Sequence, residues 1–200
     1  EKYFFNKKDI LIGSVEATAR FFEVCGVEVP KYLGYPDSLK DFYNRKIDKT
    51  TLSEYDNDYP FFIKPAEDVK MFTGALIESE SSLKFLTDYC GLADNTLLYI
   101  SEPVKFVSEY RCFVHKGELK GIQHYLGDFT VYPEPIVINH MIKAYDESPI
   151  AYTLDVGVLD TGETTLVEVN DMWAIGSYGF DSKIYVRMCI DRMMEIFNKN

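Results

Sequence analysis

The sequence contains few cysteines, and they are widely separated. None of the four forms a Cys-X-X-Cys pair; they are Cys25, Cys90, Cys112 and Cys189. This spacing argues against a disulfide framework or a zinc site and favours reduced thiols in a cytoplasmic protein. No apolar run approaches the ~20 residues of a membrane-spanning helix, and the N-terminus lacks the layout of a signal peptide. We therefore expect no membrane partner. The chain begins with Glu1 rather than Met, which leaves open whether upstream residues are missing.

Positive charge is also scarce. The chain carries 21 Lys and Arg against 32 Asp and Glu, which gives a net charge of −11. Extended binding to nucleic acid depends on clustered Lys and Arg, so a nucleic-acid partner is disfavoured. A small anionic ligand in a local cationic pocket remains compatible with this charge. The three histidines show no metal-ligand spacing; they are His115, His124 and His140.

What the chain does contain is an abundance of aromatic residues, 15 Tyr and 14 Phe, which is typical of sheet-rich packing. Two hundred residues suit one domain or two small lobes that share a cleft. The pattern predicts strands over Phe61–Lys64, Gly74–Ile77 and Leu97–Ser101, and a hairpin of Tyr110–Val114 with Leu119–Tyr125. It predicts helices that begin at Ser14 and at Ser81, one over Ile136–Ala144, and one from Ser182. Hairpins mixed with flanking helices indicate an α+β fold built on mainly antiparallel sheets.

A second hairpin carries the strongest chemical signal. Two β-rich runs, Tyr152–Leu159 and Thr164–Val169, flank the turn sequence Asp-Thr-Gly-Glu. With a two-residue turn centred on Thr161-Gly162, Asp160 would face Glu163 and Asp155 would lie opposite Glu168. Asn170 would share the face of Glu168, because side chains alternate along a strand. A loop one residue longer would break this register.

Two directly opposed carboxylates repel each other unless a cation lies between them. Hard oxygen donors at close quarters are typical Mg²⁺ ligands, usually together with substrate phosphates. The alternative is an amphipathic hairpin whose acidic residues are solvated. The neighbouring residues argue against that alternative, because apolar side chains occupy both faces: Leu154, Val156, Val158, Leu166, Val167 and Val169. Buried carboxylates need a partner or a metal.

The sequence Asp-Val-Gly, a short acidic turn and Val-Glu-Val-Asn resembles the metal-binding end of the ATP-grasp superfamily. In that family an Asp, a Glu and an Asn on adjacent strands hold ions that bridge the phosphates of ATP. The resemblance implies that Asp155, Glu168 and Asn170 bind Mg²⁺, as two ions. It covers roughly Lys46 to the C-terminus and is nearest to compact phage and bacterial ATP-grasp proteins.

The resemblance also implies an overall organisation. The ATP-grasp fold has two small lobes with mainly antiparallel sheets flanked by helices, and the ATP cleft lies between them. On this basis residues 1–45 are an abbreviated N-terminal segment, a remnant of the lobe that precedes the ATP-grasp core. Residues 46–101 form the small lobe, and residues 102–200 form the C-terminal lobe with the metal site.

Lysines are the expected phosphate ligands. Lys64 ends the apolar strand of Phe-Phe-Ile-Lys-Pro and resembles the strand lysine of the family, although a snorkelling surface lysine is the alternative. The family's upstream lysine corresponds to Lys49, with Lys46 as a second choice. The loop after the strand has only Gly74 where the family has several glycines, and Lys70 is expected to substitute for backbone amides there.

The remaining candidates lie around the expected hinge. The segment from Tyr99 to Val104 resembles the family's hinge, which implies that Glu102 and Val104 contact the adenine and that Glu109 holds the ribose. Arg111, on the face of Glu109, would point toward the phosphates or the reacting carboxyl. A cross-strand surface ion pair of Glu109 with Arg111 is the alternative. The loop 172–179, rich in aromatics, either shapes the acceptor side of the site or is simply well packed.

The function that follows from the resemblance is an ATP- and Mg²⁺-dependent ligase. It would activate a carboxylate as an acyl phosphate and join it to an amine, such as an amino acid or a peptide-like acceptor. Arg111 and Lys64 would act in catalysis. The alternatives are an ATP-dependent kinase on the same fold and a nucleotide-binding regulatory module without turnover. The sequence leaves open the identity of the substrates and the oligomeric state.

Overall fold

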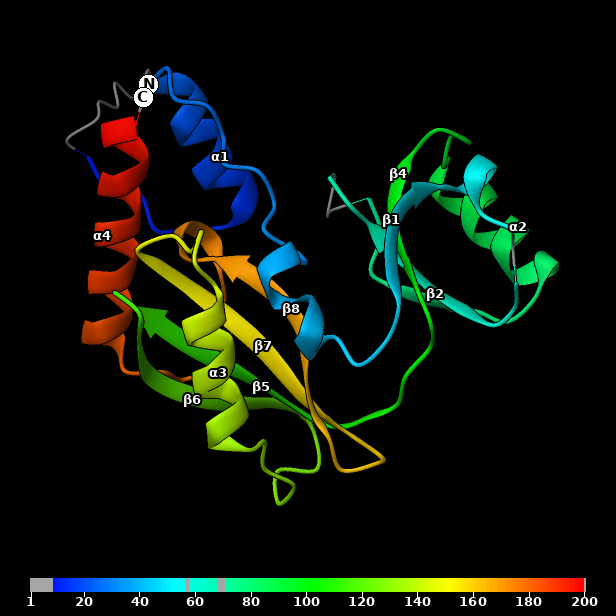
Figure 1. Cartoon of the computed structure of the whole chain (residues 1–200). Coiled ribbons are helices and arrows are strands. Elements are labelled where there is room, and N and C mark those ends of the chain that lie inside the picture. The colour runs from blue at the N-terminus through cyan, green and yellow to red at the C-terminus, as the bar shows by residue number, and fades with distance from the viewer. Residues whose placement is uncertain (1–8, 57, 68–70, 200) are drawn as a thin grey trace. The chain divides into compact units, whose positions relative to one another are not determined.

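The computed structural model describes residues 9–56, 58–67 and 71–199, which form two compact units (Figure 1). One unit is Tyr43–Lys105. The other contains the described residues before position 43 together with Phe106 and the residues that follow it. The early residues therefore share a unit with the C-terminal half of the chain. The division into segments 1–45, 46–101 and 102–200 stays a prediction about the origin of these parts.

The larger unit is built on an antiparallel four-stranded sheet with the order β6-β5-β7-β8. Its strands are β5 (Phe106–His115), β6 (Glu118–Gly127), β7 (Ala151–Leu159) and β8 (Thr164–Asp171). Every residue of β7 is buried, as expected for a strand between two neighbours that is covered on both faces. Both hairpins predicted from the sequence are confirmed, with longer strands.

Helices cover both faces of this sheet. The helix α3 (Pro135–Ala144) lies over one face of the sheet (Figure 1). Its residues Ile138 and Met141 are buried. The helix α4 (Ser182–Lys199) contributes Met188 and Cys189 to a core with Phe113 on the other face. Short 3₁₀ turns, η1 (Asp37–Phe42) and η3 (Met172–Ala174), precede and follow the strands. No helix in the described ranges is both long enough and apolar enough to cross a membrane.

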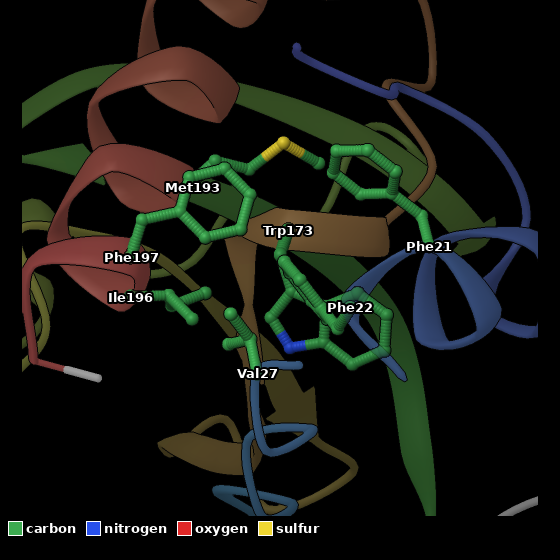
Figure 2. Packing of buried hydrophobic residues seen from close by; sticks show 7 residues of the cluster. All are labelled: Phe21, Phe22, Val27, Trp173, Met193, Ile196 and Phe197. Carbon is green, nitrogen blue, oxygen red and sulfur yellow. The ribbon is translucent and has the colours of Figure 1, made fainter. Parts of the chain in front are cut away.

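The N-terminal helix α1 (Val15–Val24) is part of this unit because its aromatic residues complete a core. Figure 2 shows Phe21 and Phe22 facing Trp173 and Phe197. The Phe22 and Trp173 ring centroids lie 5.4 Å apart at 69°, an edge-to-face contact. Each fully buried Phe stabilises the fold by roughly 1.5–3 kcal/mol. The helix begins as predicted, with Ser14 Oγ accepting from the Ala17 amide.

The smaller unit has its own antiparallel sheet with the order β1-β4-β2-β3. The strands are β1 (Ile47–Thr51), β2 (Phe61–Pro65), β3 (Ala75–Ile77) and β4 (Leu97–Ser101), and η2 (Leu52–Glu54) follows β1. Helix α2 (Glu80–Cys90) packs Leu83 and Leu86 against the buried face, which includes Ile63 and Ile100. The prediction that Ser81 opens this helix is wrong by two residues, because Ser79 is the N-cap.

The cap explains the difference. Ser79 and Ser82 form a reciprocal capping box, in which the Ser79 hydroxyl accepts from the Ser82 amide and the Ser82 hydroxyl accepts from the Ser79 amide. Two otherwise orphaned donors of the first turn are satisfied in this way. Three of the four residues from 79 to 82 are serines, so the sequence alone does not show which of them is the N-cap.

Candidate active site

The β7–β8 hairpin places Asp155 directly opposite Glu168, as the sequence predicts. The turn is longer than expected, however. The Leu159 amide bonds to the Glu163 carbonyl at 2.9 Å, and Gly162 has a φ of +93°, so the loop contains three residues. The prediction that Asp160 faces Glu163 is therefore wrong.

A β-bulge restores the register that the longer loop would have broken. Val156 pairs with Leu166, whereas Asp155 pairs with Glu168, so Val167 is an extra residue on β8. Without the bulge, Glu168 would oppose Leu154 and point to the α3 face. The spacing of the fully buried Leu166 and Val169, three positions apart rather than two, is the sequence signal for this bulge.

The structure brings Asp155, Glu168 and Asn170 together on one face of the sheet. The Asn170 amide nitrogen lies 3.2 Å from Asp155 Oδ2 and 3.0 Å from Glu168 Oε1. One amide is thus within hydrogen-bond distance of both carboxylates. Asp155 is almost completely buried, and Glu168 and Asn170 are half-buried.

Arg111 forms a bidentate ion pair with Asp155. Arg111 Nε donates to Asp155 Oδ1 at 2.8 Å, and Nη2 donates to Oδ2 at 2.6 Å. Both side chains are less than a tenth exposed. Burial raises the pKa of Asp155 to about 6, although the Arg111 cation opposes this rise. The carboxyl is therefore ionised at neutral pH.

Arg111 pairs mainly with the buried Asp155. A surface ion pair with Glu109, the alternative that the sequence left open, is not its main interaction. Because β5 lies between β6 and β7, Arg111 directly opposes Asp155 in the sheet. A buried carboxylate needs a cation, and the nearest one on its face is Arg111. The adjacency of β5 and β7 was not accessible from the hairpins alone, since β6 and α3 separate the two strands in the sequence.

Arg111 also binds the loop that follows β8. Its Nη1 donates to the Gly176 carbonyl at 3.1 Å, and the guanidinium lies 4.7 Å from the centroid of the Tyr178 ring. Tyr178 stacks on Tyr125 at 5.1 Å with an interplanar angle of 14°. The backbone of Tyr178 has a φ of +47°, which is uncommon for a residue with a side chain. The loop 172–179 is thus tied to the carboxylates through one arginine.

Glu109 lies on the face of Arg111 and accepts a hydrogen bond from the phenol of the half-buried Tyr125. Tyr125 Oη donates to Glu109 Oε2 at 2.7 Å. Burial, assisted by the charges of Asp155 and Glu109, raises the pKa of Tyr125 well above its usual range. The phenol therefore remains a neutral donor at physiological pH.

Glu168 has a partner that sequence reasoning missed. Tyr32 Oη donates to Glu168 Oε2 at 2.6 Å. The segment that carries Tyr32 pairs with β8 through Gly34 and Val169, whose amides and carbonyls bond reciprocally at 3.1 and 2.8 Å. No local pattern signals this contact, because its two residues are 136 positions apart.

The lysines expected to bind phosphate lie in the smaller unit. Lys49 on β1 and Lys64 on β2 both pair directly with Tyr99 on β4, which places all three on one face of that sheet. Each ammonium lies 6.0 Å from the centroid of the Tyr99 ring. Lys49 also faces Glu67 at 3.7 Å across an exposed pair. Lys46, the second choice, pairs with Asp48 at 2.8 Å.

The hinge residues Glu102 and Val104 lie in the connection between β4 and β5. Glu102 Oε2 accepts from the Lys46 amide at 2.8 Å, so one carboxylate oxygen fixes the start of β1. Val104 is half-buried. Lys70 lies outside the described residues.

The donor set around Asp155 suits a hard cation. In the part of the chain that the structure describes, no three His, Cys, Asp or Glu side chains cluster as a metal site. Asp155, Glu168 and Asn170 instead supply two carboxylates and an amide. Each carboxylate oxygen has two lone pairs, and Arg111 uses one on each oxygen of Asp155. Turning the Asn170 amide by a half-rotation presents its oxygen, so the residues fit Mg²⁺.

Solved structures share this fold. The chain resembles D-alanine–D-alanine ligase from Bacillus anthracis (TM-score 0.55, 14% identity, 80% of this chain and 65% of that chain). It resembles N5-carboxyaminoimidazole synthetase from Staphylococcus aureus (TM-score 0.56, 11% identity, 79% and 49%). It also resembles a RimK domain ATP-grasp protein from Sphaerobacter thermophilus (TM-score 0.51, 15% identity, 80% and 62%). The chain thus spans less than two thirds of the length of these structures.

No curated protein matches the sequence significantly. The sequence profile of a protein family does match, over residues 42–188, and it is described as ATP-grasp domain, R2K clade family 2. The matched region contains both sheets, the pair of lysines opposite Tyr99, and the trio around Asp155. This protein belongs to that clade of the ATP-grasp superfamily.

Proposed function

We propose that this protein is an ATP-dependent ligase that activates a carboxylate as an acyl phosphate and joins it to an amine. The observation that carries the proposal is the pair of opposed carboxylates, Asp155 and Glu168, which share the Asn170 amide. Membership of the ATP-grasp superfamily supports the use of ATP. Two of the structurally similar proteins are a ligase and a synthetase, which shows that this fold can carry such chemistry in other proteins.

Asp155, Glu168 and Asn170 would hold Mg²⁺. When bound, Mg²⁺ neutralises the charge that develops on the β- and γ-phosphates. Lys49 and Lys64 are proposed to bind the nucleotide phosphates as point charges. Phosphoryl transfer depends mainly on placement and electrostatics, which these residue types supply.

The other roles are proposed from membership of the ATP-grasp superfamily. Glu102 and Val104 are proposed to contact the adenine, and Glu109 the ribose hydroxyls. Lys70 is retained as a proposed phosphate ligand. The acceptor is an amine on an amino acid or a peptide-like molecule.

Arg111 is proposed to stabilise the oxyanion of the acyl-phosphate step while remaining paired with Asp155. A guanidinium has five N–H donors, and three are used in the contacts with Asp155 and Gly176. Among the contacts of the described residues, two donors remain to meet oxygens that become negative during transfer. The cation thus has a structural and a chemical role at the same time.

The test is the trapping of an acyl phosphate. Supplied with the correct carboxylate from a library of amino acids and peptides, the protein should hydrolyse ATP faster and convert hydroxylamine into a hydroxamate. Glu168→Gln should abolish both signals. It is preferred to Asp155→Asn, which would leave the buried Arg111 cation unpaired. Glu163→Gln is the matched control, because it changes an exposed Glu at the tip of the same hairpin.

Two outcomes would contradict the proposal. A stable phosphorylated product that forms without any amine would identify a kinase instead. ATP binding without a hydroxamate from any carboxylate would identify a nucleotide-binding module.

A further inference from the structure

The contact between Tyr32 and Glu168 joins a residue upstream of the region that matches the family profile to a residue within that region. The profile match begins at residue 42, whereas Tyr32 Oη donates to Glu168 Oε2 from ten positions upstream. At 2.6 Å this is a short, charge-assisted hydrogen bond to a carboxylate. The N-terminal segment of this chain thus reaches the candidate active site directly.

The segment that carries Tyr32 is fixed at several points. Gly34 forms a reciprocal bridge with Val169, the residue that follows Glu168. Further along, Leu39 is fully buried, and the Thr165 hydroxyl donates to the Phe42 carbonyl at 2.8 Å. Tyr32 is therefore held on a backbone that is anchored to β8 itself, so its hydroxyl has a defined position relative to Glu168.

The charges of the site indicate what the Tyr32 hydroxyl contributes to Glu168. Asp155 and Glu168 are directly opposed and repel each other. Asp155 is held by the bidentate Arg111, and Asn170 donates to both carboxylates. Tyr32 gives Glu168 a donor of its own, and it does so without adding a positive charge to the site. The bond opposes rotation of the flexible Glu168 side chain away from Asp155.

We propose that Tyr32 is a positioning residue that holds Glu168 in the orientation required to bind a divalent cation. This inference rests on the proposed function, because it takes Glu168 as a ligand of that cation. Groups that hydrogen-bond to metal ligands change metal affinity when they are removed, although they do not touch the metal. Tyr32 is such a group, supplied by a segment that precedes the family core.

The test measures the binding of Mn²⁺ alone, by isothermal titration calorimetry and by the electron paramagnetic resonance of the bound ion. Tyr32→Phe keeps the ring and removes only the hydroxyl, and it should weaken Mn²⁺ binding about tenfold. Tyr110→Phe is the matched control: it removes the hydrogen bond from Tyr110 Oη to the Phe129 carbonyl in the same unit. Tyr110 lies on the opposite face of the sheet, so Mn²⁺ affinity should not change.

A double-mutant cycle separates positioning from a general loss of stability. In the Glu168→Gln background, Tyr32→Phe should produce no further loss of Mn²⁺ affinity, because the group that it positions has gone. A purely structural role would lower the melting temperature in both backgrounds and leave Mn²⁺ affinity unchanged.

The inference is overturned if Tyr32→Phe binds Mn²⁺ as tightly as the wild type while Glu168→Gln does not; the proposed metal site would then still stand. A wild-type protein that binds no Mn²⁺ would overturn both. Hydroxamate formation remains an independent readout of the ligase activity itself.

Discussion

At the scale of single residues, the larger unit contains a buried ion pair with two aromatic rings beside its cation. Arg111 and Asp155 are both buried, and Tyr125 and Tyr178 lie beside the guanidinium. Removing two charges from water is costly, and their attraction offsets this cost only while both partners are present. The pair therefore affects stability and the candidate site together.

The first stability prediction follows from this pair. Arg111→Met should lower the free energy of unfolding by about 3–5 kcal/mol, because it leaves the Asp155 carboxylate buried without a cation. The double variant Arg111→Met/Asp155→Leu should recover most of that loss, since no unpaired charge remains. Urea titration of the three proteins measures the effect. Equal destabilisation of the single and the double variant would show that packing rather than charge is responsible.

The same variants reveal the titration of Asp155. Its pKa in the folded protein is about 6, above the ordinary value of 3.8, so the folded state binds this proton more tightly than the unfolded state. The corresponding stabilisation is complete below about pH 4 and is lost as the pH rises through about 6. Relative to the double variant, the wild type should lose about 2–3 kcal/mol over this interval. A difference that stays constant from pH 4 to pH 7 would contradict the raised pKa.

At the scale of elements, the sequence predicted which two carboxylates oppose each other better than it predicted the turn that brings them together. Asp155 and Glu168 are opposed as expected, but through a three-residue loop and a bulge at Val167 instead of a two-residue turn. Each deviation shifts the register by one position, in opposite directions. Alternation and turn composition locate the strands, whereas a bulge depends on which side chains the core accepts.

Contacts between distant segments could not be predicted from the sequence for a different reason. The pairing of Arg111 with Asp155 requires the strand order of the sheet, and the contact of Tyr32 with Glu168 requires the path of an irregular segment. Neither is encoded in local periodicity. Helix starts were predicted to within two residues because capping side chains are local signals.

Gly34 gives a prediction at this scale. Its φ of +55° is in the left-handed region, and so is the φ of +93° at Gly162 in the hairpin loop. Gly34→Ala and Gly162→Ala should each cost about 1 kcal/mol of stability through backbone strain. Only Gly34→Ala should also weaken Mn²⁺ binding, because the strain displaces the segment that carries Tyr32. Titration of both variants with Mn²⁺ tests this expectation. An equal change in Mn²⁺ affinity for the two variants would show that the Gly34–Val169 bridge has no effect on the site.

At the scale of the whole molecule, the chain divides into two units of unequal size. Among the described residues, one hydrophobic cluster packs between the sheet and α2 of the smaller unit, whereas separate clusters lie around α1, α4 and the sheet of the larger unit. Small units bury a smaller fraction of their surface and are less stable. The single tryptophan, Trp173, belongs to the larger unit.

Unfolding should therefore proceed in two stages. In urea, far-ultraviolet circular dichroism reports both units, and Trp173 fluorescence reports only the larger one. We expect the dichroism to begin changing at lower urea than the fluorescence, because the smaller unit unfolds first. Coincident curves would indicate a single cooperative transition and would contradict this prediction.

The bridge between Gly34 and Val169 also bears on solubility. β8 is at one edge of its sheet, and the peptide groups along such an edge can pair with a strand of another molecule. Gly34 satisfies the amide and the carbonyl of Val169 from within the same chain. We therefore expect the segment that carries Tyr32 to disfavour self-association along this edge. A substitution that loosened this segment should favour aggregation and, if Glu168 binds a cation as proposed, should also weaken Mn²⁺ binding.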